Sequence, residues 1–360
     1  MKVAVVGAGV VGLSTVLSLL EFGADVACYE AAAPMSQRSS GASRIFRLAH
    51  GSPELVELAE AARRTYAVWS ERAGAELVGG GGTAIAGPDV GEWSVAMSAA
   101  GAPHRVEDGQ RRLGLPDRSI GGPVLFDPAG GVIDAGRIGE FLIARTVPAV
   151  ALDTVYRIEL LDSGTRVWSA GGRRDFDACV LVAGAATCSL AAQVELYTPS
   201  ALFHHVRLTF PLADPARRPP CLIDKSESWR PGFTTYQHLT APGKWAVGAH
   251  FDPADTAWEL GRDRVVATSR RLTVDYVRQK LDGVEDRIVD ELYCTVTASW
   301  GDGYGVQRNG GVLTLYGDNL FKLAPVLGQL LADAALSGST PKSIMAPSLE
   351  TNEPARRPPR

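Results

Sequence analysis

Arg44 and Arg47 stand three residues apart in SSGASRIFRLAH, residues 39–50, where two cations in a mostly apolar run could bind an acidic ligand. Small, flexible residues precede them. The following stretch predicts a helix, because Ser52 can serve as its N-cap, Pro53 suits its first position, and apolar residues recur through position 69. Taken alone, the same arginines also fit a second interpretation, surface side chains that lay their apolar stems along a helix entry.

A glycine-rich loop near the N-terminus predicts dinucleotide binding. A buried strand at 3–6, a helix through position 20 and a second strand at 25–29 should form a βαβ unit around it. Gly7 permits a tight turn, Gly9 lets the backbone approach a pyrophosphate, and Gly12 lets the helix pack closely on the strand. Glu30 follows Gly12 by 18 residues, where its carboxylate can accept hydrogen bonds from a ribose. An acid there argues against NADP, which leaves NAD or FAD.

Two later segments favour FAD. Residues 173–190 contain an apolar strand (178–182) that runs into Gly184 and a helix start. Residues 310–336 repeat this plan, with a strand at 312–315, then Gly317-Asp318, and a helix over about 323–336 whose N-terminus can stabilise negative charge on a flavin. Three βα turns spread over the whole chain fit an FAD domain better than a contiguous NAD domain.

Together, the N-terminal fingerprint, GASRIFR, LVAGA and YGDNLFKLAPVLGQLLADAAL resemble the D-amino-acid-oxidase-type flavoprotein superfamily, and within it the monomeric sarcosine oxidase and N-methyltryptophan oxidase family. The resemblance covers about residues 1–340. It implies that Arg47 and Lys322 bind the substrate carboxylate and that Arg44 lies against the flavin ring. It also implies that Cys294 carries FAD covalently and that His250 is an active-site histidine. A packing cysteine and a structural histidine are the alternatives.

The predicted site follows from the loop and the resemblance together. The catalytic residues are expected to be Arg44, Arg47, His250 and Lys322, and the substrate-binding residues Arg47, His250 and Lys322. The cofactor-binding residues are expected to be Gly7, Gly9, Val10, Val11, Gly12, Glu30, Ser43, Arg44, Gly184, Cys294, Gly317, Asp318, Leu320, Phe321 and Lys322.

Three departures separate the chain from the sarcosine oxidase pattern. Ala246 stands where the family keeps a lysine that activates O₂, and Lys244 lies two residues earlier on the same face of the predicted strand. Ser40 replaces a family histidine, and WGDGYGVQR follows Cys294 in place of a different family segment. Either Lys244 substitutes, or oxygen is handled differently, or the enzyme is a poor oxidase.

Composition narrows the class of protein. The net charge of −4 gives no electrostatic case for nucleic acid, and we expect no membrane span. Five cysteines without a CxxC pair argue against a zinc ribbon or a disulfide framework and fit the cytoplasm. We see no metal-ligand partners for His204 and His205 and expect no metal site. Residues 346–360 should form a flexible tail.

The sequence therefore predicts a two-domain α/β protein with a glutathione-reductase-like fold. The FAD-binding domain should comprise 1–76, 128–196 and 291–345. An antiparallel-sheet substrate domain should comprise 77–127 and 197–290, with GGGG at 79–82 as a loop. The expected function is FAD-dependent oxidation of a carboxylate-bearing amine, with O₂ as acceptor. A dehydrogenase that uses another acceptor and a non-catalytic FAD-binding protein are the alternatives.

Overall fold

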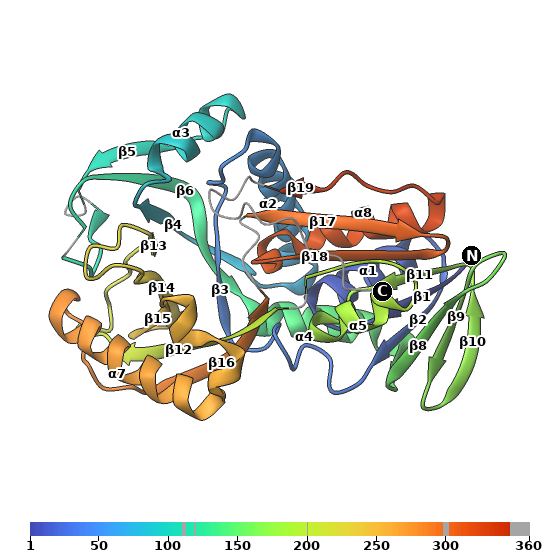
Figure 1. Ribbon diagram of the computed structural model, residues 1–360. Helices are drawn as coiled ribbons and strands as arrows, with labels where there is room; N and C mark the ends of the chain where they lie inside the picture. The colour runs from blue at the N-terminus through green and yellow to red at the C-terminus, as the bar shows by residue number, and fades with distance from the viewer. Residues whose placement is uncertain (110–112, 119, 200, 298–301, 346–360) are drawn as a thin grey trace.

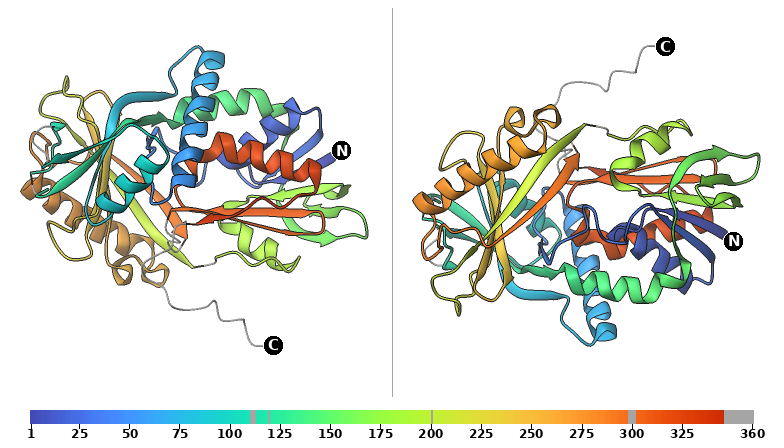
Figure 2. Two further views of the ribbon diagram at one scale, coloured as in Figure 1. Left: turned by 90° about the horizontal axis from the view of Figure 1, so that it is seen from above. Right: turned by 90° about the horizontal axis from the view of Figure 1, so that it is seen from below.

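Two large sheets and the helices that cover them make up the molecule (Figure 1). The computed structural model describes residues 1–345 apart from 110–112, 119, 200 and 298–301. The predicted flexible tail, 346–360, lies outside the described residues. The two views of Figure 2 show the sheets side by side along the long axis.

The seven-stranded sheet is built around the N-terminal strand. Its strand order is β19 (Ile344–Met345), β17 (Gly303–Asn309), β18 (Val312–Gly317), β11 (Ala178–Leu181), β1 (Lys2–Val6), β2 (Asp25–Glu30) and β7 (Val150–Leu152). β1 pairs in parallel with β2 on one side and with β11 on the other. The connections that lead to β2 and to β11 therefore lie on opposite sides of β1. In open α/β sheets, ligands bind at the carboxyl ends of the strands where the strand order reverses in this way.

Both faces of this sheet are covered, which explains the continuous apolar run of β1. Val3 and Val5 face a core shared with α1 (Val10–Glu21), α2 (Pro53–Ala73), α4 (Ala135–Thr146) and α8 (Ala324–Ser337). Ala4 and Val6 face a second core, made by a three-stranded sheet and a short helix. The elements that make it are β8 (Val155–Leu160), β9 (Thr165–Ser169), β10 (Gly172–Phe176) and α5 (Thr187–Ala192).

The larger sheet is mostly antiparallel. Its order is β16 (Asp290–Thr297), β12 (Leu202–Pro211), β15 (Lys244–His250), β14 (Thr234–Ala241), β13 (Cys221–Asp224), β4 (Val78–Ala86), β6 (Pro123–Asp134) and β3 (Ser43–Phe46), with β5 (Arg105–Asp108) on β6. On one face, Trp245 and Val247 pack against Tyr276 of α7 (Arg262–Lys280). The alternate residues of β12, β14 and β15 project from the opposite face, called the inner face below.

The four glycines at 79–82 were expected to form a loop, and this expectation is wrong. They belong to β4, which pairs with β6 through two register shifts. A Cβ at Gly131 would lie 1.9 Å from the carbonyl oxygen of Gly79, and a Cβ at Gly82 would meet the Phe126 ring at 2.2 Å. Gly82 is therefore required by the close approach of β6, and Gly81 and Gly82 also have φ values of +119° and +81°, which residues with side chains rarely adopt.

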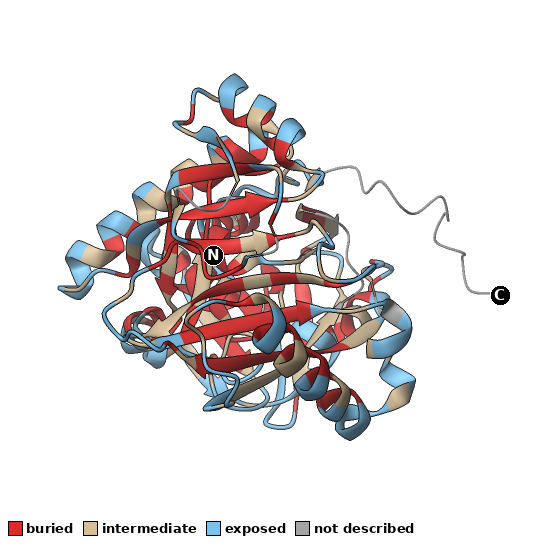
Figure 3. Ribbon diagram, turned by 90° about the vertical axis from the view of Figure 1, so that its left-hand side faces the viewer, coloured by how far each residue is buried: buried red, intermediate tan, exposed pale blue. Residues whose placement is uncertain are grey.

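Smaller elements complete the chain, and one helical stretch is apolar enough to consider as a membrane span. The smaller elements are α3 (Val90–Ala99), α6 (Pro253–Thr256), and the 3₁₀ turns η2 (Val147–Ala149), η3 (Gly184–Ala186), η4 (Trp258–Leu260) and η5 (Leu320–Leu323). The apolar stretch is 320–337, η5 with α8, and 61% of it is buried inside the protein, as the core helix of a globular fold would be. Figure 3 shows the buried residues concentrated in the strands and the inward sides of the helices.

The predicted domain division can be compared with sheet membership. β3 and β16 come from stretches that were assigned to the FAD-binding domain, yet both form edges of the nine-stranded sheet. The domain boundaries themselves stay a prediction.

Candidate active site

The glycine loop forms a cradle that side chains would fill. Gly7 has a φ of +107°, and a Cβ there would lie 2.5 Å from the carbonyl oxygen of Val182, just after β11. A Cβ at Gly12 would lie 1.9 Å from the carbonyl oxygen of Gly7. At Gly9 the only heavy atom near a Cβ is Ser39 Oγ, at 3.1 Å. Gly7 and Gly12 therefore serve the fold, while Gly9 keeps open the space over the N-terminus of α1.

Acceptor and donor groups at this cradle suit a dinucleotide. Glu30, at the end of β2, accepts hydrogen bonds from the backbone N–H of Ala8 at 2.7 Å and of Ala32 at 3.0 Å. These bonds hold the carboxylate in place and leave acceptor capacity for ribose hydroxyls. Ser39 Oγ accepts from the N–H of Val10 at 3.0 Å, so this hydroxyl lies at the helix N-terminus that attracts a pyrophosphate. The residues present fit FAD.

Arg44 reaches the turn that leads into α8. Its guanidinium lies 5.5 Å from the ring centroid of Phe321 and donates to the carbonyl oxygen of Arg38 at 3.0 Å. Arg38 in turn forms an ion pair with Asp318. Burial, and next the charge of Arg207, lower the pKa of Arg44 to about 10. Arg44 and Asp318, two of the predicted residues, thus meet through a loop residue that sequence reasoning did not select.

Arg47 is engaged by a carboxylate of the protein itself. Its Nη2 lies 2.7 Å from Oδ1 and 2.8 Å from Oδ2 of Asp302, and its guanidinium stacks 4.5 Å from the Trp93 ring. Only 6% of Arg47 is exposed. Burial raises the pKa of the Asp302 carboxyl, but the charges of Arg47 and its basic neighbours outweigh that effect and hold this pKa well below its usual range.

A second buried carboxylate positions the Arg47 segment. Asp127, which is fully buried, accepts hydrogen bonds from the backbone N–H groups of Leu48, Ala49, Ala129 and Gly130. The carboxylate thus ties the chain after β3 to the strand β6. The guanidinium of Arg47 also donates to the carbonyl oxygen of Ala49. These bonds fix the direction in which Arg47 leaves the backbone.

His50 lies beside this ion pair. Its Nδ1 is 2.9 Å from the carbonyl oxygen of Leu48, and its ring stacks on Trp93 with centroids 6.4 Å apart. Burial, and next the charge of Arg47, lower the pKa of His50 well below its usual value, so the ring is neutral. Its Nε2 is buried and has no hydrogen-bond partner among the described residues.

Lys322 brings a second cation to the same place. Tyr66 of α2 donates to the carbonyl oxygen of Phe321 at 2.6 Å, which fixes the turn η5. Lys322 is 5% exposed, and its Nζ donates to the carbonyl oxygen of Asn319 at 3.3 Å. Burial and then the charge of Arg47 lower its pKa to about 7, against the opposing effect of Asp302. The predicted partners Arg47 and Lys322 are therefore neighbours.

The inner face of the nine-stranded sheet carries the other predicted residues. His250 and Tyr236 flank His205, whose ring centroid lies 5.1 and 5.6 Å from theirs, and Cys294 Sγ lies 3.5 Å from His205 Nδ1. His250 is exposed, yet reduced solvation and then the charge of Lys225 lower its pKa to about 4. Cys294 and His250 meet around His205, which was not selected as a site residue.

Ser43 is held by groups from the same face. Its Oγ lies 3.0 Å from His238 Nε2, and its carbonyl oxygen accepts from Arg207 at 2.8 Å. Ala246, where the family lysine was expected, is fully buried and pairs with Thr209 and His238 in the sheet. Of these two partners, His238 supplies an imidazole, and the cation Arg207 pairs with Gly248, two residues along β15.

Lys244, the candidate substitute for the family lysine, and Ser40, the second departure, lie at defined positions in the fold. Lys244 is exposed at the start of β15, opposite Pro211 and Ala241. The carbonyl oxygen of Ser40 accepts a hydrogen bond from the Arg44 guanidinium. Ser40 therefore helps to hold Arg44 through its backbone, a role that its residue type does not determine.

Two more predicted glycines mark strand ends. Gly184 has a φ of +59° and begins η3 after β11. A Cβ at Gly317 would lie 2.6 Å from the carbonyl oxygen of Gly303 and 2.9 Å from Leu320 Cδ2. Both glycines follow strands next to β1 or β11 in the seven-stranded sheet, where the cofactor was expected.

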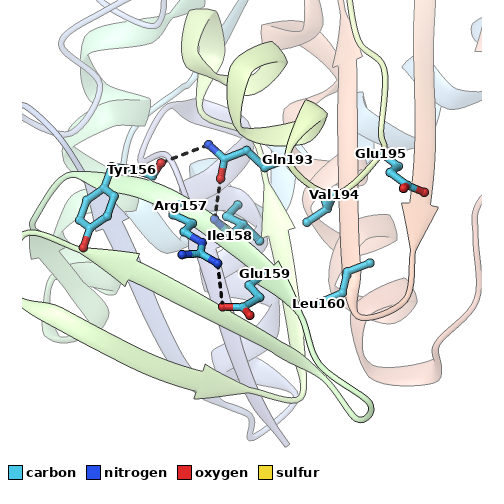
Figure 4. A pocket seen from close by; sticks show the side chains of 8 residues that line it. All are labelled: Tyr156, Arg157, Ile158, Glu159, Leu160, Gln193, Val194 and Glu195. Atoms are coloured by element: carbon cyan, nitrogen blue, oxygen red, sulfur yellow. Dashed lines mark hydrogen bonds and ion pairs between the residues drawn. The ribbon is translucent and has the colours of Figure 1, made fainter. Parts of the chain in front are cut away.

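A pocket between the three-stranded sheet and the segment after α5 lies apart from these residues (Figure 4). Several of its polar groups have partners within the protein. Gln193 accepts from the N–H of Ile158 at 2.9 Å and donates to the carbonyl oxygen of Tyr156 at 3.1 Å, and Arg157 lies 3.5 Å from Glu159. We assign it no role. Among the described residues, no group of three or more His, Cys, Asp or Glu side chains is arranged to hold a metal ion.

Comparison with known proteins decides the family. The profile of the family described as FAD dependent oxidoreductase matches residues 2–334. The chain belongs to this family. The expected membership of an FAD-dependent oxidoreductase family and the two-domain α/β fold are thereby confirmed.

Solved structures show how this FAD dependent oxidoreductase folds. An open form of NikD, "an unusual amino acid oxidase essential for nikkomycin biosynthesis", superimposes with a TM-score of 0.80 at 19% identity, over 97% of this chain and 99% of that one. Glycine oxidase from Geobacillus kaustophilus gives 0.70 at 19%, over 93% and 95%. L-proline dehydrogenase from P. horikoshii gives 0.74 at 14%, over 94% and 93%. No curated protein sequence matches the chain.

Sequence reasoning missed several residues of the site. They are Arg38, Ser39, His50, Trp93, Asp127, His205, Arg207, His238 and Asp302. Asp302 had a signal, because the segment after Cys294 departs from the family pattern. Most of the others are polar residues whose partners lie far away in the sequence, whereas Trp93 contributes an aromatic ring and His50 bonds to Leu48, two positions away.

Proposed function

We propose that this FAD dependent oxidoreductase oxidises the C–N bond of an amine that carries an acid group, such as an N-alkyl amino acid, a cyclic imino acid or a glycine-like amino acid, with O₂ as the electron acceptor. The observation that carries the proposal is the buried basic pair Arg47 and Lys322. The strand ends that suit FAD adjoin it, because Lys322 lies in η5 directly after β18. A specialised, biosynthetic substrate would fit the departures from the sarcosine oxidase pattern.

Different residues of the site bind the acid group, contact the amine and hold the cofactor. The basic site around Lys322, with Arg47 beside it, attracts the acid group and so orients the amine's C–H bond, which converts binding energy into alignment. His250 and Tyr236 lie together on the inner face, where a neutral imidazole would favour the uncharged amine over an ammonium ion. FAD, when bound, supplies the acceptor for two electrons and one proton from the C–H bond. The N–H proton leaves to solvent, and water hydrolyses the resulting imine to a carbonyl compound and an amine.

An anaerobic screen tests this function. Holoenzyme is mixed with N-alkyl glycines, proline-like imino acids and glycine, each beside the amine that lacks the acid group. We expect loss of the visible flavin absorbance only with acid-bearing amines. Equal reduction by both members of each pair would contradict recognition of the acid group. No reduction by any amine would favour the non-catalytic alternative.

Reoxidation separates an oxidase from a dehydrogenase. Arg207, a buried cation on the neighbouring strand, pairs with Gly248, two residues from Ala246 along β15, and a fixed cation near the flavin would favour electron transfer to O₂. Stopped-flow mixing of reduced enzyme with air should therefore restore the flavin spectrum within seconds. Reoxidation that needs a quinone or dye would favour the dehydrogenase alternative.

The charge of Lys322 predicts a pH dependence. Its pKa of about 7 means that it is protonated below that pH and loses the proton above it, beside Arg47, Asp302 and Lys225. KM for an acid-bearing amine should therefore rise above pH 7, by up to about tenfold per pH unit. Lys322→Arg, which stays charged, should give a flat profile. A profile with the same slope in both enzymes would assign the titration to another group.

Covalent attachment of FAD through Cys294 is a further prediction. Burial raises the pKa of the Cys294 thiol, opposed by the charges of three nearby arginines, and its Sγ lies 3.5 Å from His205 Nδ1. We expect acid-precipitated protein to stay yellow and to gain the mass of one FAD. Cys294→Ser should release all its flavin, whereas Cys188→Ser, at a partly buried cysteine elsewhere, should not. Colour in the supernatant of the unmodified protein would show non-covalent binding.

We also propose the cytoplasm as the compartment, because all five cysteines are free thiols and three of them are buried.

A further inference from the structure

We propose that Asp302 determines substrate specificity by occupying the carboxylate-binding edge of Arg47, so that Lys322 alone contacts the acid group of the substrate. This inference rests on the proposed function, since it names which of the two cations meets the substrate. Asp302 belongs to the segment after Cys294 that departs from the family pattern.

The geometry of the ion pair leaves Arg47 no edge for a second carboxylate. Both oxygens of Asp302 lie within 2.8 Å of Nη2, and Nη1 donates to the carbonyl oxygen of Ala49. One face of the guanidinium is covered by Trp93, at 4.5 Å. A substrate carboxylate could bind Arg47 only by displacing Asp302 and its two hydrogen bonds. Arg47 therefore adds little net affinity for the substrate.

Lys322 is in the opposite situation. Its ammonium group has three N–H donors, and one of them is used, at 3.3 Å, on the carbonyl oxygen of Asn319. Among the described residues, no carboxylate lies within ion-pair distance of its Nζ. Lys322 therefore keeps donors for an incoming anion. An ammonium group binds as a point charge and does not impose the planar, two-bond geometry that a guanidinium does.

The consequence is discrimination against small acids. A guanidinium in a closed site binds any carboxylate of the right shape, acetate included. With Arg47 closed by Asp302, small carboxylates should bind weakly. The substrate must then gain its affinity from the rest of its structure, which suits an enzyme dedicated to one larger amine.

Acetate titration of the holoenzyme tests the role of Asp302. Binding is followed by the rise in melting temperature and by the shift of the flavin spectrum. In Asp302→Ala, acetate should fill the gap beside Arg47, and its Kd should fall at least tenfold below that of the unmodified protein. If Asp302→Ala folds poorly, Asp302→Asn, which keeps the shape and removes the charge, should change Kd in the same direction.

Three further variants show whether Arg47 or Lys322 is responsible for the tighter binding of acetate. Asp175→Ala removes a similar two-bond pair, Arg166–Asp175, from an exposed position, and should leave acetate binding unchanged. Arg47→Met with Asp302→Ala should abolish the gain, while Lys322→Met with Asp302→Ala should keep it. An unchanged Kd in both Asp302 variants, or a gain that survives loss of Arg47, overturns the inference. Failure of the amine screen would overturn the proposed function without affecting these Kd values.

Discussion

Gly9→Val should yield a folded protein that binds almost no flavin. A Cβ at Gly9 meets only Ser39 Oγ, at 3.1 Å, so the fold can accommodate it with a small shift of one hydroxyl. The added methyl groups would occupy the space over the N-terminus of α1, where the backbone must approach the pyrophosphate. We expect the flavin bound per protein to fall below about a tenth of the unmodified value, because no other group can replace the backbone N–H donors of this turn.

Two matched glycine variants separate cofactor binding from folding. Gly91→Ala, in α3, has no heavy atom within 4 Å of the added Cβ and should bind flavin normally. Gly12→Val should fail to fold, because its Cβ would lie 1.9 Å from the carbonyl oxygen of Gly7. Far-ultraviolet circular dichroism reports the fold, and visible absorbance after gel filtration reports the flavin. Normal flavin content in Gly9→Val would contradict the placement of the pyrophosphate.

Arg47→Ala should destabilise the protein strongly, and a second substitution should reverse much of the loss. Removing the arginine leaves Asp302 as a buried carboxylate without its two charged hydrogen bonds. Breaking a buried ion pair by removing one partner costs about 3–5 kcal/mol, because the remaining charge stays buried and unpaired. The free energy of unfolding in urea should fall by about that amount.

The double variant provides the control. Arg47→Ala with Asp302→Ala removes both charges and should be more stable than Arg47→Ala alone. Glu291→Ala breaks the exposed pair with Arg270 and should change the free energy of unfolding by less than about 1 kcal/mol. A loss of less than about 1 kcal/mol in Arg47→Ala, or no recovery in the double variant, would show that this pair is not a buried, coupled unit.

Local patterns in the sequence determined the cofactor end of the protein. The spacing of Gly7, Gly9 and Gly12 between an apolar strand and a helix predicts the βαβ unit, and β1, α1 and β2 form where expected. Ser52 caps α2 by accepting from the N–H of Leu55 at 3.3 Å, as its position predicts. Such features are determined by residues within a few positions of one another, so the sequence alone contains them.

Tertiary structure decided the substrate end. Arg47 and Asp302 are 255 positions apart, and Cys294 meets His205 across 89 positions, so no local pattern relates them. The four glycines at 79–82 have the composition of a loop, and only the approach of β6 makes them part of a strand. The charge of a buried group depends on its neighbours, as the lowered pKa of Lys322 shows, and these neighbours are brought together only when both sheets are in place.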